Sequence, residues 1–308
     1  MLNTLYKRNF KITLREQKQP LMKLDFHCHT NASDGALTPH ELIDRAKSYD
    51  VTAMAITDHD TTKGYEQVKA HASEQGIQLY AGAEISCDWQ GHTIHIVALD
   101  FDVENQPLQA GLESIRALRW QRANTMLDKL AKRPNFQNHD LKSLLHQHVG
   151  EGVVGRGHFA QVLIELEYVK NSQQAFDKYL KKGRVGFAPC TWPDLAEVVK
   201  WITQAGGIAV IAHPAIYKFT SRKLNRMIED FKLAGGQGIE VINSPRPTSD
   251  TIGMVERANR YELLASMGSD FHRPEHTWRG LGWLAEMPAS CQPVWQAFKT
   301  PLQCNTQT

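Results

Sequence analysis

Apolar runs that alternate with amphipathic helical segments are the feature of this 308-residue sequence that most limits its fold. The runs are nearly continuous in apolar residues, which is typical of strands buried on both faces. Strands of this kind, separated by helices, predict a mainly parallel α/β sheet covered by helices. The predicted strands lie at 23–30, 51–60, 77–89, 91–102, 208–214, 238–244 and 263–272.

The helical segments divide the chain into a scaffold and an insertion. The first of them begins with Thr38, Pro39 and Glu41 in the order of an N-cap, a first helical proline and a capping box. Between 103 and 190 the pattern is helical with no clear strand. We therefore predict an α/β scaffold at 22–102 and 191–285, a helical insertion at 103–190, and a C-terminal tail at 286–308.

Composition excludes some classes of protein. Lys+Arg 35 against Asp+Glu 33 is close to balance, so any recognition of phosphate should be local rather than a general field for long duplexes. The five cysteines are scattered without a CxxC pair, which favours a reducing cytoplasm over a disulfide framework or a thiolate zinc site. No apolar run is long enough for a membrane helix, and no obligate protein partner is evident.

Residues 1–21 are basic but have no apolar core of the kind that a secretory signal needs. We interpret them as a disordered extension or the product of an upstream start codon. A nucleic-acid-binding arm is the alternative.

The predicted strands end in side chains that can bind metal ions. A single histidine at a strand end is usually a packed or hydrogen-bonded residue, but burying so many polar groups without an ion would be costly. Because side chains alternate along a strand, His27 and His29 share one face and Cys28 points to the other. The candidate ligands are His27, His29, Asp34, His59, Glu84, His95, His213, Asp270 and His272.

The donor set indicates the kind of metal centre. Nitrogen and oxygen donors without thiolate suit Mn²⁺, Fe²⁺ or Zn²⁺ at a catalytic site. The candidate ligands are too many for one ion with an open position, so two or three ions with a bridging carboxylate fit better. Such a centre is typical of phosphoester hydrolysis.

The ordered motifs together resemble the PHP (polymerase and histidinol phosphatase) family from Lys23 to His272. They are the two histidines at 27 and 29, "SDG" at 33–35, "TDHD" at 57–60, "GAEIS" at 82–86, a histidine in the next strand, "AHP" at 212–214 and "GSDFH" at 268–272. The resemblance implies a distorted (β/α)7 TIM-like barrel of the PHP type with a helical insertion subdomain. It also implies a trinuclear centre, usually of Mn²⁺.

Within that family the sequence is most similar to the ribonuclease AM / nucleoside 3′,5′-bisphosphate phosphatase group. The helical insertion, "GRGHFA" at 155–160 and "KYLKKGRVGFAP" at 178–189 carry this likeness. Gly157 stands where the group has proline, a departure that concerns the rigidity of the loop.

The resemblance implies a role for each candidate residue. The first ion would be held by His27, His29, Glu84 and Asp270, a second by Glu84, His95 and His213, and a third by Asp34, His59 and His272. Glu84, Asp270 and His213 would hold the ion-bridging hydroxide that attacks phosphorus. Arg156 and His158 would bind a substrate phosphate. Asp58 and Asp60 would either orient ligands or cap the next helix.

The implied activity is hydrolysis of the phosphoester on the 3′ oxygen of a 5′-phosphorylated nucleotide. One cleavage would convert a nucleoside 3′,5′-bisphosphate to a 5′-monophosphate and remove nucleotides 5′→3′ from short 5′-phosphorylated RNA, with a role in RNA 5′-end processing and turnover. Alternatives are a histidinol-phosphate phosphatase, a DNA-directed exonuclease and an inactive metal-binding scaffold.

Arg116, Arg119 and Arg122 recur along one predicted helix. They fit a solvated face better than a nucleic-acid patch.

Overall fold

The computed structural model describes residues 22–303, so the predicted extension at 1–21 lies outside the described residues. The strands are β1 (Lys23–Cys28), β2 (Val51–Ile56), β3 (Gln78–Tyr80), β4 (Gly82–Trp89), β5 (His92–Leu99), β6 (Ile208–Ile211), β7 (Gly238–Ile242) and β8 (Leu264–Met267). The α-helices are α1 (Pro39–Ser48), α2 (Lys63–Glu74), α3 (Gln106–Ala131), α4 (Leu141–Val149), α5 (Arg156–Glu165), α6 (Ser172–Ala175), α7 (Leu195–Gln204), α8 (Ser221–Leu233) and α9 (Ser249–Arg260). Shorter helical turns are η1 (Pro134–Phe136), the π-helical η2 (Phe176–Leu180), η3 (Pro214–Tyr217) and η4 (Val294–Ala297).

The strands form two sheets. One is parallel with the order β1-β2-β3, and the other has the order β4-β5-β6-β7-β8. In the larger sheet β5 runs antiparallel to both β4 and β6, whereas β6, β7 and β8 are parallel. Isolated bridges from Cys28 to Phe271 and from His59 to Glu84 join the two sheets. The α/β class is therefore confirmed, while the ladders do not form the closed barrel that the resemblance implied.

The predicted strand at 77–89 is divided between the two sheets, so its prediction as one strand was wrong. It separates at Ala81 into β3, which pairs with β2, and β4, which pairs with β5. Gly82 permits this change of sheet because its backbone passes close to β2. A Cβ at Gly82 would lie 2.5 Å from the carbonyl oxygen of Ile56.

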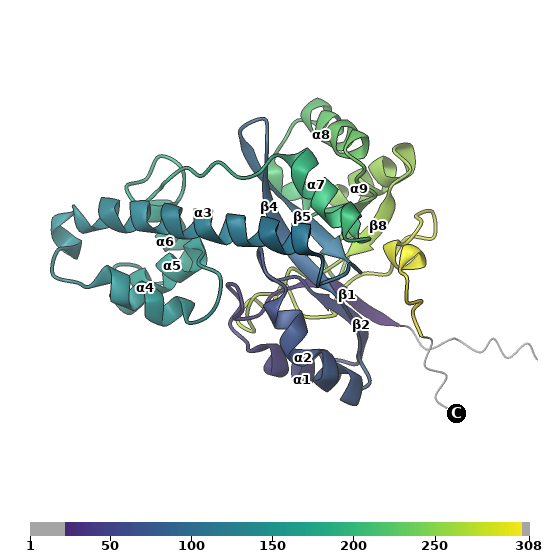
Figure 1. Cartoon of the computed structure of the whole chain (residues 1–308), viewed down its shortest axis with the longest axis horizontal. Coiled ribbons are helices and arrows are strands. Elements are labelled where there is room, and N and C mark those ends of the chain that lie inside the picture. Colours follow the sequence, from purple (N-terminus) through teal and green to yellow (C-terminus); the bar gives the residue numbers. More distant parts are fainter. Residues whose placement is uncertain (1–21, 304–308) are drawn as a thin grey trace, which may run out of the picture.

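Helices cover the outer faces of the sheets, as Figure 1 shows. α1 and α2 pack against β1 and β2 through an apolar cluster that includes Leu42, Ile43 and Val68. The predicted capping box is present, with the Glu41 N–H donating to Thr38 Oγ1 and the Thr38 N–H donating to the Glu41 carboxylate. α7 and α8 pack against the larger sheet in the main core.

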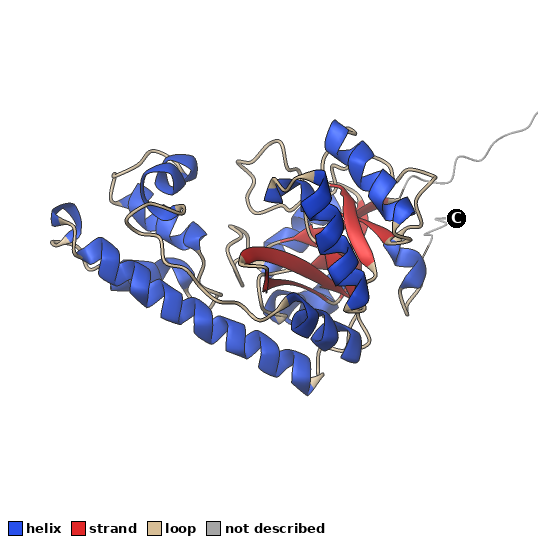
Figure 2. Ribbon diagram, turned by 90° about the horizontal axis from the view of Figure 1, so that it is seen from above, coloured by secondary structure: helices blue, strands red, loops and turns tan. Residues whose placement is uncertain are grey.

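The segment between β5 and α7 is helical and has an apolar cluster of its own. α3 spans 26 residues, and its second half packs with α4, α5 and α6 around residues such as Phe136 and Leu163. Figures 1 and 2 show this group of helices projecting from the sheets along α3. The stretch expected as a C-terminal tail packs in its described part against the main core through Val294 and Phe298. None of the helices within residues 22–303 has both the length and the apolar character that crossing a membrane requires.

Candidate metal centre

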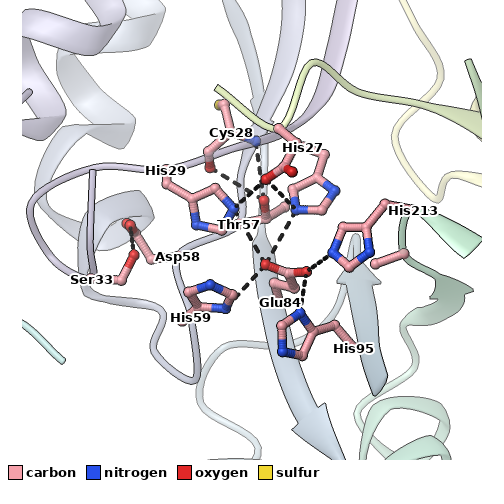
Figure 3. A network of polar contacts seen from close by, with 12 residues as sticks. His27, Cys28, His29, Ser33, Thr57, Asp58, His59, Glu84, His95 and His213 are labelled. Atoms are coloured by element: carbon pink, nitrogen blue, oxygen red, sulfur yellow. Dashed lines mark hydrogen bonds and ion pairs between the residues drawn. The ribbon is translucent and has the colours of Figure 1, made fainter. Parts of the chain in front are cut away.

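Glu84 on β4 is the middle of a cluster of histidines, shown in Figure 3. Its side chain is 1 % exposed. Oε1 lies 2.7 Å from His213 Nε2 and 2.9 Å from His95 Nδ1. Oε2 lies 3.0 Å from His59 Nδ1 and 3.3 Å from the Nε2 atoms of His27 and His29. One buried carboxylate thus faces imidazoles that come from β1, β5 and the segments after β1, β2 and β6.

Two aspartates complete the cluster. Asp270 Oδ1 lies 3.3 Å from His29 Nε2 and 3.7 Å from His27 Nε2. Asp34 Oδ1 lies 3.3 Å from His272 Nε2 and 3.8 Å from His59 Nε2. The structure therefore brings all the predicted ligands to one place, although they span residues 27 to 272 of the chain.

Three groups within the cluster have donor atoms no more than 4.8 Å apart, close enough to hold an ion. Their members are His27, His29, Glu84 and Asp270; His29, Asp34, His59 and His272; and His59, Glu84 and His95. The first group has the membership implied for the first ion. His213 belongs to none of the three and contacts Glu84 instead.

Alternation along β1 explains how one short segment supplies two donors. His27 and His29 face the cluster, whereas Cys28 lies among the apolar residues of α1 and α2. The thiol of Cys28 donates to the Ala55 carbonyl oxygen at 3.2 Å. The predicted opposite orientation of Cys28 is confirmed.

Unsatisfied polar atoms test whether the cluster fits a metal. Among the described residues, nine buried side-chain nitrogen or oxygen atoms have no hydrogen-bond partner. Eight of them belong to this cluster, namely His27 Nε2, His29 Nδ1 and Nε2, Asp34 Oδ1, His59 Nδ1, Glu84 Oε2, His95 Nδ1 and His213 Nδ1. Buried polar atoms normally have partners, and a shared cation would serve donors of this type. The residues fit a nitrogen- and oxygen-ligated metal centre.

At Glu84, Asp34 and His29 the electrostatics favour the forms that bind cations. Burial alone would raise the pKa of Glu84, but His59, His95 and His27 hold that pKa well below its usual range. Burial alone would also raise the pKa of Asp34, which His272 and His59 hold well below its usual range. Burial, together with the charge of His272, lowers the pKa of His29. The cluster thus presents ionised carboxylates and a neutral imidazole at His29.

Glu240 on β7 is a functional residue that the sequence analysis missed. Its Oε1 lies 2.5 Å from His27 Nδ1, and its Oε2 accepts the backbone N–H of His213 at 2.5 Å. Glu240 therefore holds the ring of His27 and the backbone of His213 in place. The signal in the sequence was a single acidic residue within the otherwise apolar strand "GIEVI", a position where an unpaired carboxylate would be costly.

Asp25 and Arg279 were also missed. The Asp25 carboxylate on β1 accepts the N–H groups of Ser269 and Gly282, at 2.9 and 2.8 Å, and so ties the segment around Asp270 to β1. Arg279 forms an ion pair with Asp270. Asp25 had the same signal as Glu240, whereas the sequence around Arg279 has no pattern that relates it to the cluster.

Asp58 and Asp60 orient the cluster rather than cap α2. Asp58 accepts hydrogen bonds from the Thr30 N–H and the Ser33 hydroxyl, at 2.7 and 2.6 Å, and so holds the loop that carries Asp34. Asp60 accepts the Ser86 N–H at 2.7 Å, next to Glu84 on β4. The N-cap residue of α2 is Thr62, and it makes no side-chain capping hydrogen bond.

The arginines of α3 do not form a solvated face, so that prediction was wrong. Arg119 is 9 % exposed; its Nε lies 2.5 Å from Asp60 Oδ2, and it donates to Ser86 Oγ at 2.9 Å. Arg116 donates to the Asp60 carbonyl oxygen at 2.9 Å. Arg122 donates to the Ala188 carbonyl oxygen at 2.9 Å. Helical periodicity placed these side chains together, but α3 turns them toward protein rather than toward solvent.

Arg156 and His158 lie at the start of α5, beside Asp34. A Cβ at the intervening Gly157 would be 3.5 Å from the Asp34 side chain. Arg156 lies over the Phe176 ring and lines a small recess together with Arg119 and Arg122. His158 is 4 % exposed, and its Nδ1 accepts the Gly155 N–H at 3.0 Å. Burial lowers the pKa of His158, and the charge of Asp34 and a hydrogen bond with the Ser33 backbone partly oppose this shift.

Comparison with known proteins agrees with this geometry. The PHP domain model matches residues 25–188. A 5′-3′ exoribonuclease from Haemophilus influenzae is 40 % identical over 90 % of this chain and 99 % of its own length. A 3′,5′-nucleoside bisphosphate phosphatase from Chromobacterium violaceum is 39 % identical over 91 % of this chain and 97 % of its own length.

Solved structures agree as well. The structure of a C. violaceum protein described as an amidohydrolase, with bound sulfate and no metal, superposes with a TM-score of 0.83 at 38 % identity, over 89 % of this chain and 95 % of that chain. The resemblance that the sequence motifs predicted is confirmed. The chain belongs to the PHP domain family.

Proposed function

We propose that this chain is a metal-dependent phosphoesterase that hydrolyses the phosphoester on the 3′ oxygen of 5′-phosphorylated nucleotides. Its substrates are nucleoside 3′,5′-bisphosphates, which yield a 5′-monophosphate and phosphate, and short 5′-phosphorylated RNA, which loses its first nucleotide. One bond cleavage serves both, and the two relatives are named for these two activities. The observation that carries the proposal is the set of buried donor atoms around Glu84 that have no hydrogen-bond partner.

The cluster would hold three ions, with Mn²⁺ favoured and Fe²⁺ or Zn²⁺ also suited to its donors. The three groups of donors within 4.8 Å of one another support this number. When bound, the ions would lower the pKa of a coordinated water and neutralise phosphate oxygens. Glu84 would serve two sites, because it belongs to two of the groups. Glu240 holds the ring of His27 in place for this role.

The helices between residues 103 and 190 would hold the substrate's 5′-phosphate. Arg156 is the side chain that we assign to it, because it begins α5 next to Gly157, which lies against the Asp34 side chain at the edge of the cluster, and because a guanidinium can form paired hydrogen bonds to phosphate. His158 makes its described contacts with backbone groups of Gly155 and Ser33. It would position the turn that carries Arg156.

Turnover of adenosine 3′,5′-bisphosphate by the metal-loaded protein tests the function. Release of phosphate with Mn²⁺, Fe²⁺ or Zn²⁺, together with release of a 5′-mononucleotide from a 5′-phosphorylated RNA dinucleotide, is expected. No turnover of either substrate with any of the three metals would leave only a metal-binding scaffold. Faster turnover of histidinol phosphate would overturn the substrate assignment.

Arg156→Ala is expected to raise KM for the bisphosphate and reduce kcat/KM about 10- to 100-fold, the effect of losing one charge-assisted contact of about 1.5–3 kcal/mol. Metal content should stay at the wild-type level, because no cluster donor is changed. Steady-state kinetics and elemental analysis of the same preparation measure both. Arg226→Ala, at an exposed position on α8, is the control. An unchanged kcat/KM would remove Arg156 from the phosphate site.

Metal binding to the metal-free protein is expected to release protons and to tighten as pH rises from 6.5 to about 10. Burial alone would lower the pKa of His27, but the charges of Glu240 and Glu84 raise it from 6.5 to about 10. Over that interval His27 keeps a proton that a cation at Nε2 must displace, so competition weakens with rising pH.

Calorimetric titration with Mn²⁺ at pH 8, in two buffers of different ionisation enthalpy, counts the protons released. Glu240→Gln removes one of the carboxylates that raise the pKa of His27, so this variant should release fewer protons. Equal release from both proteins would contradict the assignment.

A further inference from the structure

A cavity lies beside the metal centre and has no part in the function proposed so far. Its volume is about 500 Å³. One wall is the loop between β7 and α9, with Ser244 and Arg246, and the other is the segment with Trp278, Arg279 and Trp283. The first wall follows β7, the strand that carries Glu240. The second wall comes after β8 and Asp270.

The cavity has two exposed tryptophans. Trp278 is 63 % exposed and Trp283 is 57 % exposed. Large apolar side chains with this exposure are few among residues 22–303, and the others, on α8, α9, η3 and the end of α1, do not line this cavity. Trp278 is stacked on His276, with ring centroids 4.8 Å apart and an interplanar angle of 22°, and its exposure leaves area for contact with a second ring.

Charge around the cavity favours an anion attached to an aromatic group. Arg246 and Arg279 line it, and no Asp or Glu is among the described lining residues. Exposed tryptophan beside arginine is the combination that binds single-stranded nucleic acid, with the base stacked on the ring and the phosphate near the guanidinium. Arg279 already pairs with Asp270, so a purely apolar partner would leave the Arg246 guanidinium, for which the described residues give no ion pair, without an anion.

Arg279 connects this cavity to the metal centre. Its guanidinium pairs with Asp270, one of the cluster carboxylates, and it also lines the cavity. Arg156 lies on a different flank of the cluster, beside Asp34. An RNA whose attacked phosphate lies at the cluster would therefore have its first nucleotide toward Arg156 and its second nucleotide toward Trp278.

We infer that this cavity holds the base of the second nucleotide of an RNA substrate, the nucleotide that carries the attacked phosphate on its 5′ oxygen. This rests on the proposed function and adds to it. The cavity makes the enzyme favour RNA over a bisphosphate, because a bisphosphate has no second base. Stacking on an indole tolerates any base, which suits an exonuclease that must accept each nucleotide in turn.

The experiment compares two substrates on the metal-loaded full chain. Trp278→Ala is expected to lower kcat/KM about ten-fold for 5′-phosphorylated diadenylate, the scale of one lost base–aromatic stack, and to leave adenosine 3′,5′-bisphosphate unchanged. Trp278→Phe should recover most of the loss because it retains an aromatic face. A dinucleotide whose second residue lacks its base should be equally slow with wild type and Trp278→Ala. Tyr49→Ala, at an exposed aromatic residue after α1, is the control.

Binding provides a readout that does not depend on turnover. Diadenylate should quench the fluorescence of Trp278, so the quenching amplitude should fall in Trp278→Phe. The bisphosphate should not quench Trp278 in the wild type. Equal loss on both substrates, or no loss on the dinucleotide, would overturn the inference. If wild type turns over neither substrate, the proposed function fails, and the quenching alone then decides whether the cavity binds the second base.

Discussion

Glu84→Gln is expected to reduce kcat/KM for adenosine 3′,5′-bisphosphate by about 10³-fold or more and to lower the metal content of the purified protein. Five histidine nitrogens lie within 2.7–3.3 Å of the carboxylate. Glutamine has nearly the same shape as glutamate but no negative charge, so it neutralises neither the charge of the cations nor that of the imidazoles. Loss of several kcal/mol of charge stabilisation at a metal centre corresponds to a factor of this size.

Elemental analysis and steady-state kinetics on one preparation check this result, and thermal unfolding shows whether the variant is folded. Glu229→Gln is the matched control, because Glu229 is exposed on α8 and contacts the Tyr261 hydroxyl rather than the cluster. Wild-type activity in Glu84→Gln, or loss of activity with full metal content, would show that Glu84 does not bridge ions.

Arg119→Met is expected to lower the free energy of unfolding by about 3–5 kcal/mol, the effect of leaving one charge of a buried ion pair without its partner. The side chain of Arg119 is 10 % exposed and that of Asp60 is fully buried. Arg119 also donates to Ser86 Oγ and to the Val154 carbonyl oxygen. Arg119 therefore connects α3 to the segment after β2, to β4 and to the segment before α5. Loss of the pair should loosen the attachment of the helical insertion to the metal centre.

Urea unfolding of Arg119→Met, Asp60→Asn and the double variant measures the coupling between the two residues. The double variant should be more stable than Arg119→Met, because the uncompensated carboxylate is then gone. Arg116→Met on the same helix is the control. Arg116 is partly exposed, pairs with the exposed Glu113 and donates to the Asp60 carbonyl oxygen. Its loss leaves no buried charge unpaired, so it should cost about 1–2 kcal/mol. Equal effects of the two arginine variants would contradict a special role for the buried pair.

Local sequence was enough to identify most of the metal cluster. Strand alternation determined that His27 and His29 share a face and that Cys28 does not, and the structure agrees. The helical segments were also predictable, because capping residues such as Thr38 and the 3.6-residue period are local properties. Donor chemistry in the order of the motifs predicted the PHP family, which the comparisons confirmed.

Contacts between distant segments were not predictable in the same way. Glu240 is 213 residues from His27, and Asp60 is 59 residues from Arg119, so no sequence period relates the partners. The arginines of α3 illustrate the limit. A helical period shows which side chains share a face, but only the packing of α3 against other segments decides that this face is buried. Those segments supply Asp60, Ser86, Val154 and Ala188.

The sequence by itself determined the α/β class, the helices, the family and the donors at the strand ends, because each follows from the chemistry of neighbouring residues. Only the tertiary structure decided that the strand predicted at 77–89 is divided between two sheets at Ala81. It also placed His213 against Glu84. Two exposed tryptophans share a cavity with Arg279, which in turn pairs with Asp270. The physical reason is that backbone pairing and side-chain contact depend on how close segments approach in space, and that distance is set by the packing of the whole chain.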